Sequence, residues 1–103
     1  MNETVCKFSV GQLISHRLFK YRGVIVDVDP VFQGTDEWYE QMAGSRPPKD
    51  HPWYHVVVDQ ASHMTYVAER NLTEDFKNLP VENPLLDNYF QVFKDSKYMT
   101  YVS

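Results

Sequence analysis

Two short apolar segments with a two-residue repeat restrict the fold of this chain more than any other feature. Residues 21–29 and 53–59 are rich in valine and are followed by proline or by polar turn residues. In the first segment, Val24, Val26 and Val28 fall on one face of an extended chain. The proline directly after it cannot donate to a sheet ladder and ends the strand. The pattern predicts antiparallel β-structure.

Further strands are predicted on either side of these segments. Residues 7–17 also have strand character, and residues 64–68 pair with 53–59 as a hairpin around the turn DQASH. Both faces of the 53–59 segment carry large apolar groups, which predicts a central, well-covered strand.

Two short helices are predicted between and after the strands. Thr35 is a suitable N-cap for TDEWYEQMA, and Asn83-Pro84 opens PLLDNYFQVF with proline at the first helical position. Residues 71–76 suggest a single helical turn, and the tail 97–103 alternates as a final strand or an arm. Short strands with two small helical insertions favour a small β-barrel over a βαβ fold.

The size of the chain predicts one domain, residues 1–103, with one core. No apolar run approaches the roughly 20 residues of a membrane span, so we expect no membrane partner. The start MNETVCKFSV lacks the features of a secretory signal, and the only cysteine, Cys6, cannot form an internal disulfide. We therefore expect a cytoplasmic location.

The charge is distributed unevenly. The net charge of -4 argues against a general nucleic-acid coat, but residues 1–26 hold four basic residues and one acid. From residue 27 onward there are thirteen acids and six basic residues. A local positive patch on an acidic body and an ordinary solvated loop both remain open.

The histidines do not form a recognisable metal site. His51 and His55 lie about 13 Å apart in an extended chain, whereas zinc needs both nitrogens at about 2 Å. His63 lies across the hairpin turn, and no set of ligands is complete. We expect His55 to be hydrogen-bonded at the edge of the core. Asp27 and Asp29 share a strand face and are interpreted as solvated carboxylates, with acid–base work or cation binding as the alternative.

No catalytic motif is present. The sequence lacks the nucleophile-elbow, P-loop and dinucleotide-binding patterns, and no histidine lies near Cys6 in the sequence to activate it. We expect a non-enzymatic protein with no metal and no cofactor.

The segment 16–22, HRLFKYR, is the best candidate for a nucleic-acid contact. Its cations can neutralise phosphates, and an exposed Phe19 or Tyr21 can stack on an unpaired base. Three fixed charges give weak, salt-sensitive affinity unless oligomerisation repeats the patch. The predicted DNA-binding residues are His16, Arg17, Lys20, Tyr21 and Arg22.

The order of three segments resembles a known family. VGQLISHRLFKYRGVIVDVDPVF, then HPWYHVVV, then TYVAERNL are similar to the YccV-like, or HspQ, family, whose members carry the name hemimethylated-DNA-binding domain. The resemblance runs from about Lys7 to Leu72. The insertion GTDEWYEQM and the ending NPLLDNYFQVF look more like the domain versions in F-box proteins and in a chloroplast Clp-protease adaptor.

This resemblance implies an SH3-like β-barrel without catalysis and two alternative roles. The first is a heat-shock regulator that binds hemimethylated DNA, and the second is a stress-related adaptor or specificity factor for an ATP-dependent protease. The bacterial form implies a homotrimer. An adaptor needs an exposed apolar patch, for which four aromatic residues are candidates. The alternative is that these residues pack in the core. Those candidates are Trp38, Tyr39, Phe90 and Phe93.

A third alternative is a tudor-like or SH3-like peptide reader with an aromatic groove beside His55. The preferred prediction is a mainly β, SH3-like barrel with two short helices that binds hemimethylated DNA.

Overall fold

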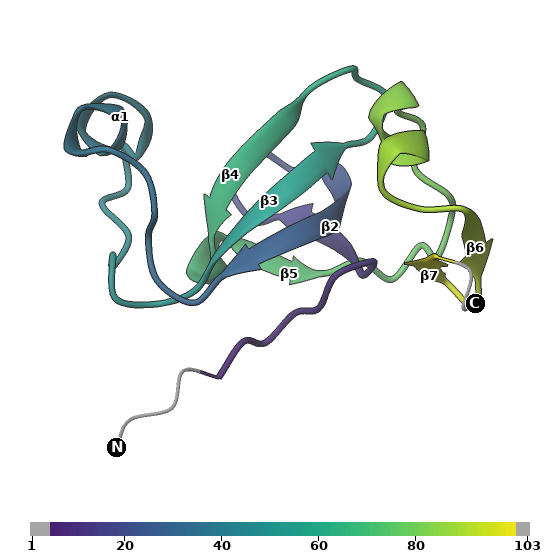
Figure 1. Cartoon of the computed structure of the whole chain (residues 1–103). Coiled ribbons are helices and arrows are strands. Elements are labelled where there is room, and N and C mark those ends of the chain that lie inside the picture. The colour runs from purple at the N-terminus through teal and green to yellow at the C-terminus, as the bar shows by residue number, and fades with distance from the viewer. Residues whose placement is uncertain (1–4, 101–103) are drawn as a thin grey trace.

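The computed structural model describes residues 5–100, which are mainly β. The elements are β1 (Leu13–His16), β2 (Arg22–Asp29), α1 (Asp36–Met42), β3 (Trp53–Val58), β4 (Met64–Ala68), the 3-10 helix η1 (Glu69–Asn71), β5 (Leu72–Glu74), the 3-10 helix η2 (Pro84–Asn88), β6 (Val92–Lys94) and β7 (Lys97–Met99). Five strands form an antiparallel sheet in the order β4-β3-β2-β1-β5, and β6 pairs with β7 in a separate sheet (Figure 1). The prediction of a mainly β chain is confirmed. Among the described strands no ladder joins β4 to β5, so the five-stranded sheet is not closed.

The hairpin β3–β4 agrees with the sequence prediction, but β2 is more irregular. The ladder between β2 and β3 shifts at a β-bulge, because Ile25 pairs with Val56 whereas Asp27 pairs with His55. The extra residue turns the strand, so that Val28 packs with the cluster of Ile25. The predicted common face of Val24, Val26 and Val28 is therefore wrong for Val28.

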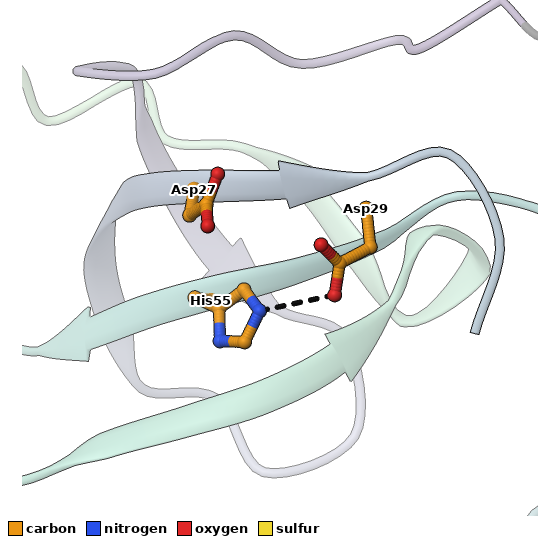
Figure 2. A group of neighbouring side chains, drawn as sticks. All are labelled: Asp27, Asp29 and His55. Carbon is orange, nitrogen blue, oxygen red and sulfur yellow. Dashed lines mark hydrogen bonds and ion pairs between the residues drawn. The ribbon is translucent and has the colours of Figure 1, made fainter. Parts of the chain in front are cut away.

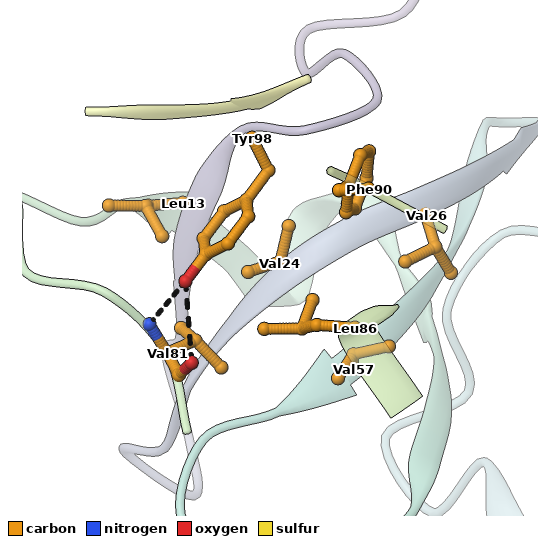
Figure 3. Packing of buried hydrophobic residues seen from close by; sticks show 8 residues of the cluster. All are labelled: Leu13, Val24, Val26, Val57, Val81, Leu86, Phe90 and Tyr98. Atoms are coloured by element: carbon orange, nitrogen blue, oxygen red, sulfur yellow. Dashed lines mark hydrogen bonds between the residues drawn. The ribbon is translucent and has the colours of Figure 1, made fainter. Parts of the chain in front are cut away.

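The two faces of the sheet are covered by different parts of the chain. The C-terminal segment covers one face, where Tyr98 donates its hydroxyl to Val81 O at 3.3 Å and accepts the Val81 N–H at 2.8 Å (Figure 3). The C-terminal segment thus buries the core of its own sheet. That cluster consists of Leu13, Val24, Val26, Val57, Val81, Leu86, Phe90 and Tyr98. A second cluster consists of Phe8, Ile14, Ile25, Tyr54, Val56, Val67 and Leu72.

The predicted helices differ in outcome. Thr35 caps α1 as expected, since its Oγ1 accepts the N–H of Trp38 at 3.1 Å. Asn83 accepts the N–H of Leu85 at 2.9 Å, but the element that follows is a five-residue 3-10 helix. A second α-helix is not found within residues 5–100.

The helical turn predicted at 71–76 is wrong, because residues 72–74 of that segment form the strand β5. Ladder pairing of Leu72 with His16 outweighs the local preference of the segment. Of the alternating tail, residues 97–99 form β7, and residues 101–103 lie outside the described part.

Candidate functional site

The connection between β1 and β2 is a tight turn that presents basic and aromatic side chains. The His16 N–H donates to Tyr21 O at 2.8 Å, and the Lys20 N–H donates to His16 O at 3.0 Å. Lys20 adopts a φ of 63°, in the left-handed region that allows the chain to reverse. The Arg17 N–H donates to Asn71 O at 2.8 Å, which ties the turn to η1.

The side chain of His16 holds the backbone of this turn in place. Its Nδ1 accepts the backbone N–H groups of Leu18 and Phe19, each at 3.1 Å. These two bonds require a neutral ring with its proton on Nε2. His16 is buried, and this burial lowers its pKa from the ordinary value of about 6.5. His16 therefore positions the turn and leaves no ring nitrogen charged toward solvent.

The three cations of segment 16–22 have different environments. Arg17 and Lys20 are exposed, although Arg17 Nε donates to Leu72 O at 3.2 Å. Arg22 is turned inward: its Nη1 lies 3.1 Å from Asp59 Oδ2 and its Nη2 lies 3.1 Å from Asp75 Oδ2. Two of the three cations therefore face solvent.

Arg22 is a structural clamp. Its side chain is 12% exposed and that of Asp75 is 3% exposed. Nη2 also donates to Leu79 O, whereas Nε is buried and has no hydrogen-bond partner among residues 5–100. Burial alone would lower the pKa of Arg22, but the hydrogen bonds and negative charges of Asp75 and Asp59 outweigh it and raise the pKa. The guanidinium joins β2 to the β3–β4 turn and to the segment after β5.

The aromatic residues of the turn also divide into an inner and an outer one. Phe19 is 75% exposed and stacks on His16, with ring centroids 4.7 Å apart. Tyr21 is half-buried, and its hydroxyl lies 2.7 Å from Thr65 Oγ1. Burial raises the pKa of Tyr21. Phe19 is the more accessible stacking surface of the two.

An open groove of about 760 Å³ lies between this turn, β4 and the α1 region. Its lining includes Phe19 and Tyr21 from the turn, Trp38 and Met42 from α1, and all of β4. Among residues 5–100, none that lines it is Asp, Glu, Lys or Arg. The groove therefore suits an uncharged, apolar or aromatic group.

The four predicted protein-binding residues lie in two separate places. Trp38 lines the groove and is half-buried, while Tyr39 is buried and donates its hydroxyl to Pro47 O at 2.7 Å. Phe90 is buried in the cluster under η2, and Phe93 packs against the same cluster. Trp38 alone of the four lines the groove.

Two acids and a histidine meet on β2 and β3 (Figure 2). One ligand atom each from Asp27, Asp29 and His55 lies within 4.8 Å of the others. Asp29 Oδ2 lies 3.1 Å from His55 Nε2 and accepts the hydroxyl of Tyr66 at 2.6 Å. Burial and this donation to Asp29 raise the pKa of Tyr66. A cation here would have to compete with both bonds, so the arrangement serves to orient His55 and Tyr66 at the side of the groove.

The expected hydrogen bond of His55 at the core edge is confirmed, but its partner, Asp29, was not identified from sequence. Asp27 lies opposite His55 in the β2–β3 ladder, and Tyr66 lies opposite His55 in the β3–β4 ladder. The hairpin register predicts the second pairing, since the turn DQASH fixes it. The pairing of Asp27 with His55 cannot be predicted from the alternation of residues, because the β2 bulge shifts the register. An aromatic groove beside His55 was one of the sequence alternatives, and His55 lines this groove. Its walls from the β1–β2 turn and from α1 were not predicted, because they come from segments distant in sequence.

Two findings apply to the whole described chain. Within residues 5–100, every helix is too short and too polar to span a bilayer. In the comparison with known protein families, residues 6–97 match the YccV-like family, described as hemimethylated DNA-binding protein YccV like.

Proposed function

Because the chain belongs to the YccV-like family, we propose that it is a non-enzymatic, HspQ-type regulator that binds DNA and prefers hemimethylated sites. The family match over residues 6–97 is the observation that carries this proposal. No bond-making chemistry is required of the site, since binding needs only cations for phosphate and surfaces for bases. A single exposed cysteine, Cys6, is compatible with action in the cytoplasm.

The fold proposed for this function is one SH3-like domain over the whole chain. The strand order β4-β3-β2-β1-β5 supports it, as does the 3-10 helix η1 between β4 and β5. In this arrangement the β1–β2 turn and the β2–β3 insertion with α1 both contribute to the lining of the groove.

Arg17 and Lys20 are the proposed phosphate contacts. Both are exposed cations on a turn whose backbone is fixed by His16. Phe19 is the proposed stacking side chain, and Tyr21 supports the turn through its contact with Thr65. Arg22 acts indirectly in this scheme, because its guanidinium is held by Asp59 and Asp75.

Two exposed cations per chain give weak binding by themselves. Each phosphate that a cation neutralises adds a salt-sensitive contribution to the binding affinity, and the acidic remainder of the chain repels the duplex. We propose a homotrimer, which would present three such turns to one DNA molecule and gain affinity through multivalency.

A titration of hemimethylated and fully methylated duplexes tests the DNA proposal. The wild-type protein is expected to prefer the hemimethylated duplex and to lose affinity steeply with salt. The charge-reversed variant Arg17→Glu/Lys20→Glu is expected to lose measurable binding. The matched control Lys77→Glu/Lys94→Glu changes the net charge equally at two other exposed lysines and should bind far better. Equal affinity of the two variants would refute the assignment of the turn.

A second candidate function is supported by the uncharged groove. An adaptor or specificity factor for an ATP-dependent protease needs an accessible apolar surface, and Trp38 and Met42 contribute to one. The test is the degradation rate of a model substrate by a purified protease with and without this protein. An increase that Trp38→Ala removes would support the adaptor, and no increase with any protease tested would reject it.

A further inference from the structure

The strand β4 forms one edge of the five-stranded sheet, and its hydrogen-bonding pattern shows which groups face outward. The Val58 N–H donates to His63 O at 3.3 Å, and the Glu69 N–H donates to Pro52 O at 3.0 Å. In an antiparallel ladder, hydrogen-bonded pairs alternate with non-hydrogen-bonded pairs. Thr65 therefore directs its backbone groups toward β3, as does Val67.

The remaining residues of β4 direct their backbone groups away from β3. These residues are Met64, Tyr66 and Ala68. Within residues 5–100, no further strand pairs with Met64 or Tyr66, whereas Ala68 is the N-cap of the 3-10 helix η1. The exposed fraction of the residue falls from Met64, at 36%, to Ala68, at 3%. The edge is thus most open around Met64 and Tyr66.

The usual means of protecting an edge strand are missing from β4. Its sequence, MTYVA, contains no charged residue and no proline. Its ladder with β3 runs from Trp53 opposite Ala68 to Val57 opposite Met64 without a register shift. Native edge strands normally carry a lysine, a proline or a bulge, because unpaired backbone groups invite another strand. An unprotected edge in an otherwise acidic, polar chain indicates a surface for strand addition.

The groove follows this edge. All five residues of β4 line it, together with residues of the β1–β2 turn and with Trp38 and Met42 of the α1 region. At the end near Ala68, Arg70 donates to Ser45 O and ties η1 to the chain after α1. Figure 1 shows β4 as the sheet edge nearest α1. The outward-facing backbone groups of β4 and the apolar side chains of the groove therefore lie along the same edge of the sheet.

We propose that this groove binds an extended polypeptide segment that adds as a strand to β4 and places bulky uncharged side chains against Trp38 and Tyr66. The backbone groups of Met64 and Tyr66 supply the pairing, and the aromatic walls supply selectivity. Because the lining carries no fixed charge, a charged side chain would lose its hydration without gaining a partner. Met42 and Met64 provide flexible surfaces that accept different apolar side chains. This inference deepens the second candidate function and is independent of DNA binding.

A short synthetic peptide tests the proposal directly. The probe is acetylated, amidated Gly-Ser-Thr-Phe-Thr-Phe-Thr-Ser-Gly, in which large uncharged side chains alternate with threonine. Amide hydrogen exchange of the full chain is followed by NMR with and without the peptide. In the free protein Thr65 and Val67 are expected to be protected by β3. Added peptide is expected to slow exchange at Met64 and Tyr66.

Two peptide controls separate strand addition from simple apolar adhesion. The first carries the same side chains with every core amide N-methylated, which removes the donors of the backbone. The second replaces both phenylalanines by glutamate. Each is expected to bind at least about tenfold more weakly than the probe, and tenfold corresponds to 1.4 kcal/mol. Equal binding of the N-methylated peptide would overturn the proposal.

Protein variants complete the test. Met64→Lys places a charge at the open end of the edge and should weaken the probe at least about tenfold. Phe76→Lys makes the same kind of change at an exposed residue outside the groove and should leave the affinity for the probe unchanged. Thermal unfolding of both variants checks that they fold. Arg17→Glu/Lys20→Glu should keep peptide binding, so that failure here and failure of DNA binding are distinguished.

Other occupants of the groove give different results. Protection of Met64 and Tyr66 that rises with protein concentration alone would assign the edge to a second copy of the chain. Protection induced by a hemimethylated duplex, with displacement of the peptide, would assign the groove to nucleic acid. Either outcome, or absence of peptide binding, would overturn the proposal.

Discussion

His16 shows how a residue in a predicted DNA contact can act through the backbone. Its ring accepts two N–H groups of the turn, stacks on Phe19 and packs at a tilt against Tyr21. The sequence indicated the importance of segment 16–22, but the burial of His16 depends on β5, which pairs with it from 56 residues away. The role of a side chain inside such a turn could not be predicted without that pairing.

The lowered pKa of His16 predicts a pH-dependent stability. Above about pH 6.5 the ring is neutral in the folded and unfolded chain, so its contribution is complete. Below about pH 6.5, His16 binds a proton in the unfolded chain but stays neutral in the folded chain. The free energy of unfolding therefore falls by up to about 1.4 kcal/mol per pH unit. This decrease in stability ends when the pH reaches the pKa of His16 in the folded chain.

The variant His16→Asn tests this dependence, because Asn Oδ1 can accept the same N–H groups without titrating. Urea unfolding at pH 7.5 and pH 5.0 should show a smaller loss of stability for the variant than for the wild type. The same loss in both proteins would contradict the assignment, since the other titrating groups are common to them.

Arg22 is predicted to matter more for folding than its neighbour Lys20. Removing the guanidinium by Arg22→Ala leaves the carboxylate of Asp75 buried without its cation, at a cost of about 3–5 kcal/mol. Lys20→Ala removes an exposed cation and should change stability by less than about 0.5 kcal/mol. Denaturant unfolding measures both, and similar values for the two variants would refute the clamp.

At the level of elements, local signals were accurate where the partner of a residue is near in sequence. The cap by Thr35, the β3–β4 hairpin and the start of η2 after Asn83 follow from such signals. β5 and the β2 bulge depend on pairing with distant strands, and local propensity cannot indicate them. The third sequence alternative expected an aromatic groove beside His55, but the walls that the β1–β2 turn and α1 add to it come from distant segments and could not be predicted locally.

The junction between the two sheets depends on a glycine. Gly11 has a φ of 92°, its N–H donates to Ile25 O at 2.7 Å, and its carbonyl accepts the Tyr98 N–H at 2.9 Å. A Cβ at this position would lie 2.1 Å from Tyr98 O. Only glycine allows β7 to approach the larger sheet here.

Gly11→Ala is therefore expected to destabilise the chain strongly, by more than the roughly 1 kcal/mol of an ordinary glycine effect. Gly44→Ala is the matched control, because a Cβ there would meet nothing within 4 Å. Thermal unfolding should show a lowered Tm for Gly11→Ala and little change for Gly44→Ala. Equal Tm values would show that β7 adapts without strain.

For the whole molecule, charge and shape favour different partners. The net charge of -4 and the loss of Arg22 to an internal ion pair leave a small basic surface. The groove and the open edge of β4 form a second accessible feature, which carries no fixed charge among the described residues. A DNA-binding trimer and a peptide-binding edge can coexist in one chain, since Arg17 and Lys20 do not line the groove.

The salt dependence of DNA binding reports how many copies of the turn contact one duplex. The logarithm of the association constant falls with the logarithm of salt concentration with a slope of about -0.9 for each phosphate neutralised. Two cations, Arg17 and Lys20, predict a slope of about -1.8 for a monomer, and three copies predict about -5.4. Fluorescence anisotropy at several salt concentrations gives the slope, and sedimentation equilibrium gives the mass of the free protein. A steep slope that Lys20→Ala reduces by about half would support the trimer, because each copy then loses one of its two contacts. A slope near -1.8 with a monomeric mass would reject the trimer and leave the turn as a weak, single contact.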